Sequence, residues 1–577
     1  MTTPADAAPA AEEDFEGKRL VRTGGGDKGL SLGERLAERL HRLTWRTPLH
    51  AMHLRGRHPL KLIAVPDDPL LGDVARGEAL MAGRFVFRGE GVAIDDLGAA
   101  PLPRALADHI HSFIWLRDLS TVARRVEAAP VAERAMRGWL TLHADKVSQP
   151  AWRGDLVGRR IMSWAAHAPL ILSSADLVYR SKVLNTLARQ ARHLERGADK
   201  VAPGAPRVAA WAGALTAALL IPGGDVKRAA LEAGLARALA GAVFADGGAV
   251  ARAPLAQLDL IALLTLLSQV YAVRRLEVAE PIRTTLYRMV PALLGVCHGD
   301  RGLASWQGGG PVAGETIAEL VTASGVRARP MRQTRDWGYQ RLSAATTTVI
   351  VDAAPPPIAR LIEGGCASTL AFELSDGPQR IVVNCGGART ADAGLPPALA
   401  EGLRTTAAHS TLILADSNST AIHADGTLGR GVVEVELSRQ ETDSASRIEA
   451  AHDGYVRRYG FLHRRQLALA TDGRELRGED MLLPSGKRRR ADAIPFAIRF
   501  HLAPGIRVSP TADGLAALLR LPAGPVWQFR CRGAALAVED SVWIDAAGRP
   551  QGSQQLVLTA EAPAGGASVG WALRRAN

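Results

Sequence analysis

The chain has 577 residues, more than one hydrophobic core usually supports, so at least two domains are expected. A hydrophobic content of 47% with 22% charged residues is typical of a soluble globular protein, and the net charge of +12 is compatible with a polyanionic partner. The four cysteines are widely spaced and lack a CxxC pair, which excludes a disulfide framework and a zinc ribbon and predicts four buried thiols.

The N-terminal segment is small, then acidic, then glycine-rich, and we expect residues 1–30 to be disordered. It contains neither the basic nor the apolar segment of a secretory signal. The longest apolar run, residues 208–221, has roughly 14 residues, whereas a membrane-crossing helix needs about 20. No secretory signal and no transmembrane segment are therefore predicted.

Residues 31–325 carry the three- and four-residue spacing of apolar side chains that is typical of helices. The pattern begins with an apolar stripe formed by Leu32, Leu36, Leu40 and Leu43. Short breaks separate the segments, so consecutive helices are expected to be antiparallel neighbours. Residues 81–89 are an exception, because they alternate like a short strand. The predicted helices cover residues 106–126, 131–145, 174–195, 208–220, 226–243, 255–276 and 281–296.

Residues 326–577 change to alternating, β-branched segments separated by Gly, Asp and Pro, which is the pattern of an antiparallel all-β domain. A helical half followed by a strand half indicates a multidomain α+β chain. The basic run 487–490 is interpreted as a solvated hairpin tip; no aromatic residues interleave with it, so no nucleic-acid partner is expected. The predicted strands cover residues 346–352, 369–374, 380–384, 410–414, 431–437, 465–471, 497–502, 516–521 and 555–559.

Histidines recur at the edges of these predicted strands. His409, His452 and His463 lie near the ends of apolar segments, and His423 lies in a polar stretch that reads as a loop. Neutral imidazole is the commonest biological metal ligand and a frequent general base near neutral pH. Residues from neighbouring strands can converge on one sheet face, so the histidines are candidates for a common site. The alternative is a set of scattered surface residues.

Seven local motifs follow one another along the chain. They are Asp246-Gly247-Gly248 through Arg252-Ala253-Pro254, His298-Gly299-Asp300, Gly308-Gly309-Gly310, Gly338-Tyr339-Gln340-Arg341, Val383-Asn384-Cys385-Gly386, Ala408-His409-Ser410-Thr411-Leu412, and His452-Asp453-Gly454-Tyr455 through His463-Arg464-Arg465. In this order they resemble the motifs of the heparinase II/III family of polysaccharide lyases. The resemblance covers about residues 150–560 and implies an N-terminal (α/α) toroid, residues 31–325, packed on a C-terminal antiparallel β-sandwich, residues 326–577.

The resemblance implies a lyase that cleaves a uronic-acid polymer by β-elimination. This chemistry needs a group that neutralises the substrate carboxylate and two groups that exchange protons, often Tyr and His. The catalytic candidates are His409, Tyr455, His167 and Tyr179, with Trp164, Arg189 and His193 as further helical candidates. The substrate-binding candidates are Arg341, His463 and Arg464. For each of them, a packing or ion-pair role is the alternative.

The resemblance also implies a structural metal in the sandwich, usually zinc. His409 and His452 are the predicted ligands, completed by Asp453 or, alternatively, by Asp416 or Asp425. The competing interpretation is that both imidazoles bind buried backbone groups.

Two functions follow from these observations. The first is a lyase acting on an acidic polysaccharide. The second is a non-catalytic module that binds cell-envelope polysaccharide, which the absence of the family's Asn-His dipeptide from this sequence favours. The missing secretory signal predicts a cytoplasmic protein, whereas the resemblance implies the periplasm or cell envelope. Monomer and homodimer both stay open.

Overall fold

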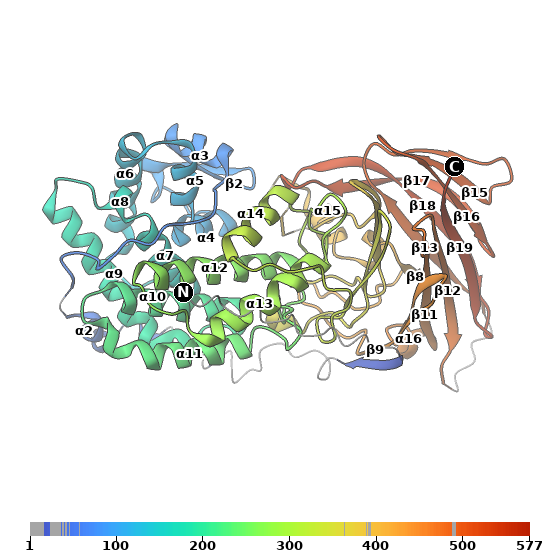
Figure 1. The fold of residues 1–577 in the computed structure, drawn as a ribbon, viewed down its shortest axis with the longest axis horizontal. Helices are drawn as coiled ribbons and strands as arrows, with labels where there is room; N and C mark the ends of the chain where they lie inside the picture. The colour runs from blue at the N-terminus through green and yellow to red at the C-terminus, as the bar shows by residue number, and fades with distance from the viewer. Residues whose placement is uncertain are drawn as a thin grey trace, which may run out of the picture.

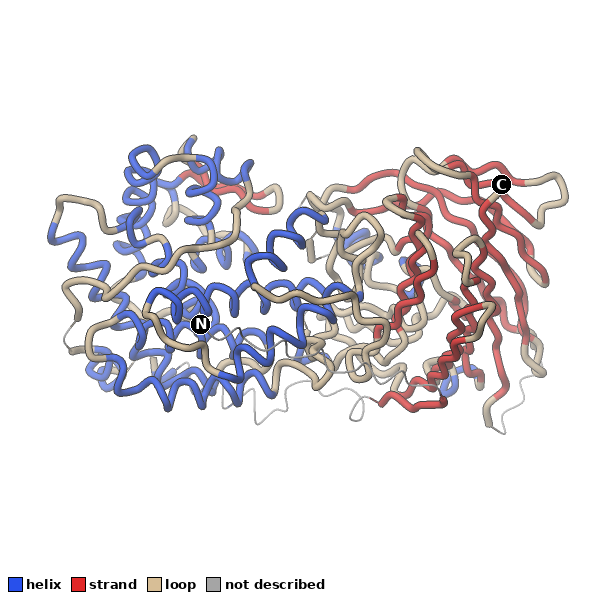
Figure 2. The backbone as a smooth tube through the Cα atoms, viewed as in Figure 1, coloured by secondary structure: helices blue, strands red, loops and turns tan. Residues whose placement is uncertain are grey.

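The computed structural model describes residues 17–22, 36, 40, 43–45, 47–56, 58–362, 364–387, 389–390, 394–486 and 492–576. Helices gather at one end of an elongated molecule and strands at the other (Figure 1, Figure 2). The predicted fold class, a helical N-terminal half followed by antiparallel β-sheets, is confirmed. Parts of the N-terminal segment, Leu32 and the basic run 487–490 lie outside the described residues.

The helical half also contains a two-stranded hairpin, β2 (Arg84–Phe87) and β3 (Glu90–Ala93), where a short strand was predicted. The helices within the described residues are α2 (Pro48–Leu54), α3 (Val74–Met81), α4 (Arg104–Ser112), α5 (Trp115–Val122), α6 (Arg125–His143), α7 (Gly154–Ala166), α8 (Ala168–Ile171), α9 (Leu177–Gly197), α10 (Ala205–Leu220), α11 (Arg228–Ala240), α12 (Pro254–Val273), α13 (Glu280–Gly295) and α14 (Gly314–Ser324).

The predicted single helix over residues 106–126 is wrong, because the structure divides this segment among α4, α5 and the start of α6. The first break falls at Phe113, whose φ of 59° is left-handed and ends α4. The Phe113 ring is fully buried against three tryptophans, so tertiary packing holds a backbone conformation that helical periodicity does not reveal.

The core of this half is built around α10, which is apolar on all sides and buried along most of its length. It crosses α7 closely, because a Cβ on Gly213 would lie 2.3 Å from the Cα of Gly158. On its other sides α10 packs against α9, α11 and α12. Among the described helices, α12 is long and apolar enough to cross a membrane, but 56% of that apolar window is buried within the protein, where α10, α13 and α14 cover it.

The β half contains two large antiparallel sheets. The nine-stranded sheet has the order β1-β9-β10-β11-β12-β19-β16-β15-β14, and the other has the order β17-β18-β13-β7-β6-β5-β4, with β8 paired to β13. A common apolar core fills the space between them, with Phe372 and Trp571 stacked at its centre. The described strands are β1 (Gly17–Arg22), β4 (Tyr339–Ala344), β5 (Thr347–Asp352), β6 (Phe372–Asp376), β7 (Gln379–Val383), β8 (Leu412–Leu414), β9 (Glu434–Glu441), β10 (Ala445–His452), β11 (Phe461–Ala470), β12 (Glu475–Pro484), β13 (Ile494–Leu502), β14 (Arg507–Pro510), β15 (Ala516–Arg520), β16 (Val526–Arg532), β17 (Ala535–Ile544), β18 (Pro550–Ala562) and β19 (Ala567–Arg575), with short helices α15 (Pro397–Gly402) and α16 (Val456–Tyr459).

The prediction that residues 1–30 are disordered is wrong for residues 17–22. These residues form β1, which adds to the edge of the C-terminal sheet by pairing with β9 (Figure 1). Val21 is buried in the sandwich core, and Arg22 forms an ion pair with Glu434 at 2.7 Å. The short run Leu20-Val21 gave too little alternation to reveal a strand whose partner lies more than four hundred residues away.

The two halves are joined by residues of the family-like motifs. Arg252 is buried and donates to Asp352 at 2.5 Å and to the Trp337 carbonyl at 2.8 Å. In return, the Tyr339 hydroxyl donates to the Arg252 carbonyl. Asp246, in the loop before α12, accepts the backbone N–H of Trp337 at 2.8 Å. These motifs therefore lock the helical half onto the first strands of the sandwich.

Candidate functional site

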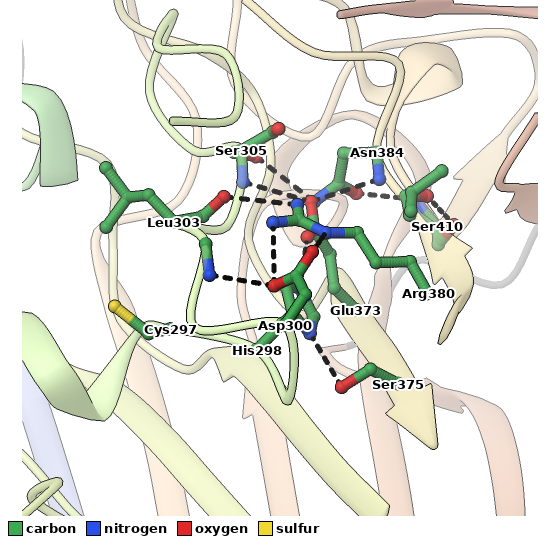
Figure 3. A network of polar contacts seen from close by, with 12 residues as sticks. Cys297, His298, Asp300, Leu303, Ser305, Glu373, Ser375, Arg380, Asn384 and Ser410 are labelled. Atoms are coloured by element: carbon green, nitrogen blue, oxygen red, sulfur yellow. Dashed lines mark hydrogen bonds and ion pairs between the residues drawn. The ribbon is translucent and has the colours of Figure 1, made fainter. Parts of the chain in front are cut away.

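A buried polar network begins at this junction and is centred on Glu373 of β6 (Figure 3). One carboxylate oxygen of Glu373 accepts the backbone N–H of Ser305, the backbone N–H of Asn384 and the Asn384 side-chain amide, at 3.2, 3.2 and 3.0 Å. The other oxygen lies 2.7 Å from Nε2 of His298. Glu373 is fully buried, and these donors replace the water that an ionised carboxylate would otherwise need.

His298 brings the helical half into this network. It lies in the turn after α13, its Nδ1 is 3.1 Å from the Ser375 hydroxyl, and both of its ring nitrogens are thus engaged by strand β6. Burial lowers the pKa of His298, so the imidazole is neutral at neutral pH. The next residue must be glycine, because a Cβ on Gly299 would lie 2.0 Å from the Gly377 carbonyl oxygen of the sandwich.

The network continues across the sandwich. Oδ1 of Asn384 accepts the backbone N–H of Ser410, and the Ser410 carbonyl accepts from Arg465 at 2.8 Å. Arg465 is paired with Asp480 of β12 at 2.8 Å, and Asp480 also lies 2.8 Å from Nε2 of His463. The chain of contacts ends at His452, whose Nε2 is 3.2 Å from Nδ1 of His463.

All the ionisable groups at this far end are buried. Burial lowers the pKa of His463, and burial with the neighbouring His463 and Arg465 holds the pKa of His452 well below its usual range. Although burial alone would raise the pKa of Asp480, Arg465 and His463 keep it below the ordinary value. The result is a charged Arg465–Asp480 pair flanked by neutral imidazoles, an arrangement that orders the core of the sheet.

The predicted catalytic residues of the sandwich are sealed within it. His409 is 2% exposed, and its Nδ1 lies 2.7 Å from the Thr405 carbonyl. Tyr455 is 1% exposed and donates its hydroxyl proton to the Leu412 carbonyl at 3.0 Å. Burial lowers the pKa of His409 and raises that of Tyr455. These contacts are those expected under the packing alternative, in which His409 and Tyr455 do not contact a substrate.

The predicted helical candidates are also engaged. Tyr179 donates to the Ile171 carbonyl at 2.9 Å and lies under the Arg137 guanidinium. Trp164 and His193 are buried and pack among other aromatic rings. His167 is engaged as well, with Nδ1 3.1 Å from the Ser163 carbonyl and Nε2 3.4 Å from the Ser120 hydroxyl, but its Nε2 also lies 3.9 Å from Asp68, which lines a cavity.

The predicted substrate-binding residues do not converge. Arg341 donates to the Cys297 carbonyl and to the Thr348 hydroxyl, and therefore serves the junction between the halves. His463 is fully buried beside Asp480. Arg464 points from the opposite face of β11 and lies 3.6 Å from Glu449.

The predicted zinc ligands do not fit a metal site in the structure. His409 faces the Thr405 carbonyl, His452 faces His463, and Asp453 accepts the backbone N–H groups of Val433 and Glu434. Among the described residues, no group of three or more His, Cys, Asp or Glu side chains is arranged to hold a metal ion. The predicted alternative, contacts of both imidazoles with buried backbone groups, describes His409 and also His452, whose Nδ1 accepts the backbone N–H of Gly454 at 3.1 Å.

A cavity of about 130 Å³ in the helical half is lined by charged side chains, whereas the sandwich histidines are buried. It is lined by Asp68, Arg117, Arg159 and Asp259 together with apolar residues of α5, α7 and α12. Arg117 is paired with Asp68 at 2.7 Å. Within the described residues, no ion pair engages Arg159, so its positive charge is available to the cavity.

Two further arginines extend this positive region toward the sandwich. Arg88, in the β2–β3 turn, interacts electrostatically with Arg389 and Asp259. The pKa of Arg88 is lowered by burial and by the positive charge of Arg389, and the negative charge of Asp259 only partly offsets this. The sequence reading missed Arg88, Arg159, Asp259 and Arg389. In a chain with 70 lysines and arginines, single arginines carry no signal, and the common location of these four residues depends on the packing of four distant segments.

Glu373 and Asp480 were also missed. A carboxylate within an apolar strand, as in Ala371-Phe372-Glu373-Leu374, is a usable signal, because a buried charge needs dedicated partners. Its partners, His298 and Asn384, were both noted as parts of separate motifs.

The comparisons with known proteins agree with this architecture. The family described as Heparinase II/III-like, C-terminal matches residues 326–572. The predicted resemblance is confirmed for this half.

The whole chain is similar to FtsZ-localized protein C of Caulobacter vibrioides (strain NA1000 / CB15N). The two are 29% identical over 560 residues, which cover 92% of each chain. Among solved structures, heparinase III matches with a TM-score of 0.69 and 11% identity over 96% of this chain and 93% of that chain. Heparan sulfate lyase HepC from Pedobacter heparinus matches with a TM-score of 0.58 and 13% identity, over 94% of this chain and 88% of that one. The chain thus has the fold of these lyases along its full length.

Proposed function

We propose that this protein is a non-catalytic binding module of the heparinase II/III fold that localises with FtsZ. The observation that supports the first part is the burial of the expected acid–base groups: Nδ1 of His409 lies 2.7 Å from the Thr405 carbonyl, and the Tyr455 hydroxyl donates to the Leu412 carbonyl. The second part rests on the full-length similarity to FtsZ-localized protein C. The proposal takes the cytoplasm, rather than the periplasm, as the protein's location.

Fluorescence microscopy of a tagged full-length chain in the cell that encodes it tests this proposal. The fusion is expected to form a band at mid-cell that coincides with FtsZ and disperses when FtsZ is depleted. A diffuse or envelope-wide signal that ignores FtsZ depletion contradicts the proposal.

A second candidate function, an acidic-polysaccharide lyase, is favoured by the helical cavity. Arg159 and Arg117 supply positive charge for a uronate carboxylate, and His167 lies behind the cavity wall at Asp68 with a pKa lowered by burial, as a neutral base requires. No tyrosine lines this cavity, so the proton donor expected for the leaving oxygen is missing from its described lining.

The lyase candidate is tested by incubating the purified chain with heparin, hyaluronan and alginate and following the ultraviolet absorbance of the unsaturated product. The binding-module proposal expects no absorbance on any polymer. Product formation that is abolished in Arg159→Ala would establish the lyase instead.

A further inference from the structure

An open groove of about 360 Å³ crosses the outer face of the nine-stranded sheet. This sheet lies at the end of the molecule farthest from the helices (Figure 1). It is lined by side chains of β9, β10, β11 and β12. The opposite face of these strands packs into the sandwich core, so the groove lies away from the junction network and from the helical cavity.

The strand register gives this face of the sheet two parallel rows that run across the strands. The first row alternates arginine and alanine: within the groove, Arg477 pairs with Ala468, and Ala468 with Arg447. The row continues beyond the groove, where Ala572 of β19 pairs with Arg477 and with Arg530 of β16. These three arginines are exposed. Since neighbouring strands lie about 4.8 Å apart, arginines on alternate strands recur at about 9.6 Å.

The second row has the opposite character. Glu479 pairs with Gln466, Gln466 with Glu449, and Glu449 with Ser438. Gln466 donates to Glu449 at 2.5 Å, and Ser568 donates to Glu479, so both carboxylates are held in place. A ligand in the groove thus meets a positive row on one side and a negative row on the other.

The arginines of the first row are available for binding. Within the described residues, no ion pair engages Arg447, whereas Arg477 and Arg530 form exposed pairs with Glu475 and Asp513 at 2.9 and 3.7 Å. Exposed pairs of this kind contribute little and exchange readily. A guanidinium also binds a carboxylate through two parallel hydrogen bonds, which favours an acidic partner over a merely polar one.

We propose that this groove binds an extended polypeptide segment with an acidic side chain at every third position and a basic side chain beside it. A polyproline II helix has three residues per turn and rises about 3.1 Å per residue, so every third side chain lies on one face at about 9.3 Å spacing. That spacing matches the arginine row. The neighbouring face of the segment presents its basic side chains to Glu449 and Glu479.

The same features disfavour other polyanions. No aromatic side chain lines the groove, so neither nucleic-acid bases nor sugar rings find a surface on which to stack. A uniformly acidic chain is repelled by the glutamate row. The inference goes beyond the proposed function and does not depend on FtsZ, because it concerns the chemistry of this groove alone.

Fluorescence anisotropy with the full-length chain tests the proposal. The probes are labelled peptides of repeated Glu-Lys-Pro, Glu-Glu-Pro and Lys-Lys-Pro, with labelled heparin as the glycan. The Glu-Lys-Pro peptide is expected to bind most tightly and to weaken as salt is added. The double variant Arg447→Ala, Arg477→Ala is expected to bind it at least about fivefold more weakly, because two charge-assisted contacts are lost.

Arg507→Ala is the matched control, because Arg507 is an exposed arginine of the same sheet at its far edge, on β14. It is expected to leave binding unchanged, and all three substituted positions are exposed, so the variants should keep the wild-type urea midpoint. The proposal is overturned if no peptide binds, if heparin or the uniformly acidic peptide binds more tightly, or if the double variant binds as the wild type does.

Discussion

Replacing Glu373 tests whether the junction network is structural or catalytic. In Glu373→Ala, the backbone N–H groups of Ser305 and Asn384 lose the acceptor that the structure gives them. A buried unsatisfied donor costs about 1–3 kcal/mol, and the cavity left by the side chain adds to that. The Asn384 amide and His298 retain other partners, Ser305 and Ser375. The expected loss of unfolding free energy is about 4 kcal/mol.

The isosteric change Glu373→Gln should be far milder. The glutamine oxygen can accept the same three N–H groups, and its amide can donate to Nε2 of His298 if that imidazole carries its proton on Nδ1, facing Ser375. What is lost is the charge assistance of the bonds, so the expected cost is about 1–2 kcal/mol.

Urea unfolding of both variants, followed by tryptophan fluorescence and far-ultraviolet circular dichroism, measures these free energies. A loss below about 1 kcal/mol in Glu373→Ala would refute the structural role. If Glu373 were catalytic instead, Glu373→Gln would keep wild-type stability and abolish a lyase activity that the wild type possesses.

Three further outcomes follow from the junction and the buried histidines. Arg252→Met leaves Asp352 buried without its cation and should cost about 3–5 kcal/mol in urea unfolding, whereas adding Asp352→Leu should restore part of that loss. Gly248→Ala places a Cβ 2.1 Å from the Trp337 ring and should cost about 1–3 kcal/mol, while Gly402→Ala, which has open space around it, should be neutral. Acid should destabilise the fold, because burial lowers the pKa of His109 to about 4 and those of His111 and His501 to about 3, against an unfolded value near 6.5. The contribution of these neutral histidines to the free energy of unfolding is complete above about pH 6.5, and each loses about 1.4 kcal/mol per pH unit as the pH falls toward its folded pKa. Urea midpoints that stay constant from pH 7 to pH 5 would contradict this.

The sequence predicts the fold well because the fold follows from local patterns. The apolar run 208–221 covers most of the buried helix α10, and the alternation that begins at residue 465 is part of β11. The failures are non-local. The break at Phe113 is held by aromatic packing, and β1 exists because β9 offers an edge far along the chain.

The candidate site was harder to predict, because the role of a buried histidine is decided by its neighbours across the sheet. The sequence predicts His452 as a metal ligand and His463 as a substrate-binding residue of one site. The register of β10 with β11 places the two directly opposite each other. The sequence did not reveal Asp480, which β12 brings beside His463. With that carboxylate and Arg465 in place, the polar groups of the cluster contact one another.

The residues that carry the family resemblance hold the two halves together. Arg252, His298, Asn384 and Ser410 all bind partners across the junction or along the network that starts there. The resemblance is therefore informative about how a helical toroid-like half is fixed to a β-sandwich, and it says little about the chemistry between them. Activity has to be judged on the residues that the motifs do not include. Arg159 is the most testable of these, because it lines a cavity and no ion pair engages its guanidinium within the described part of the chain.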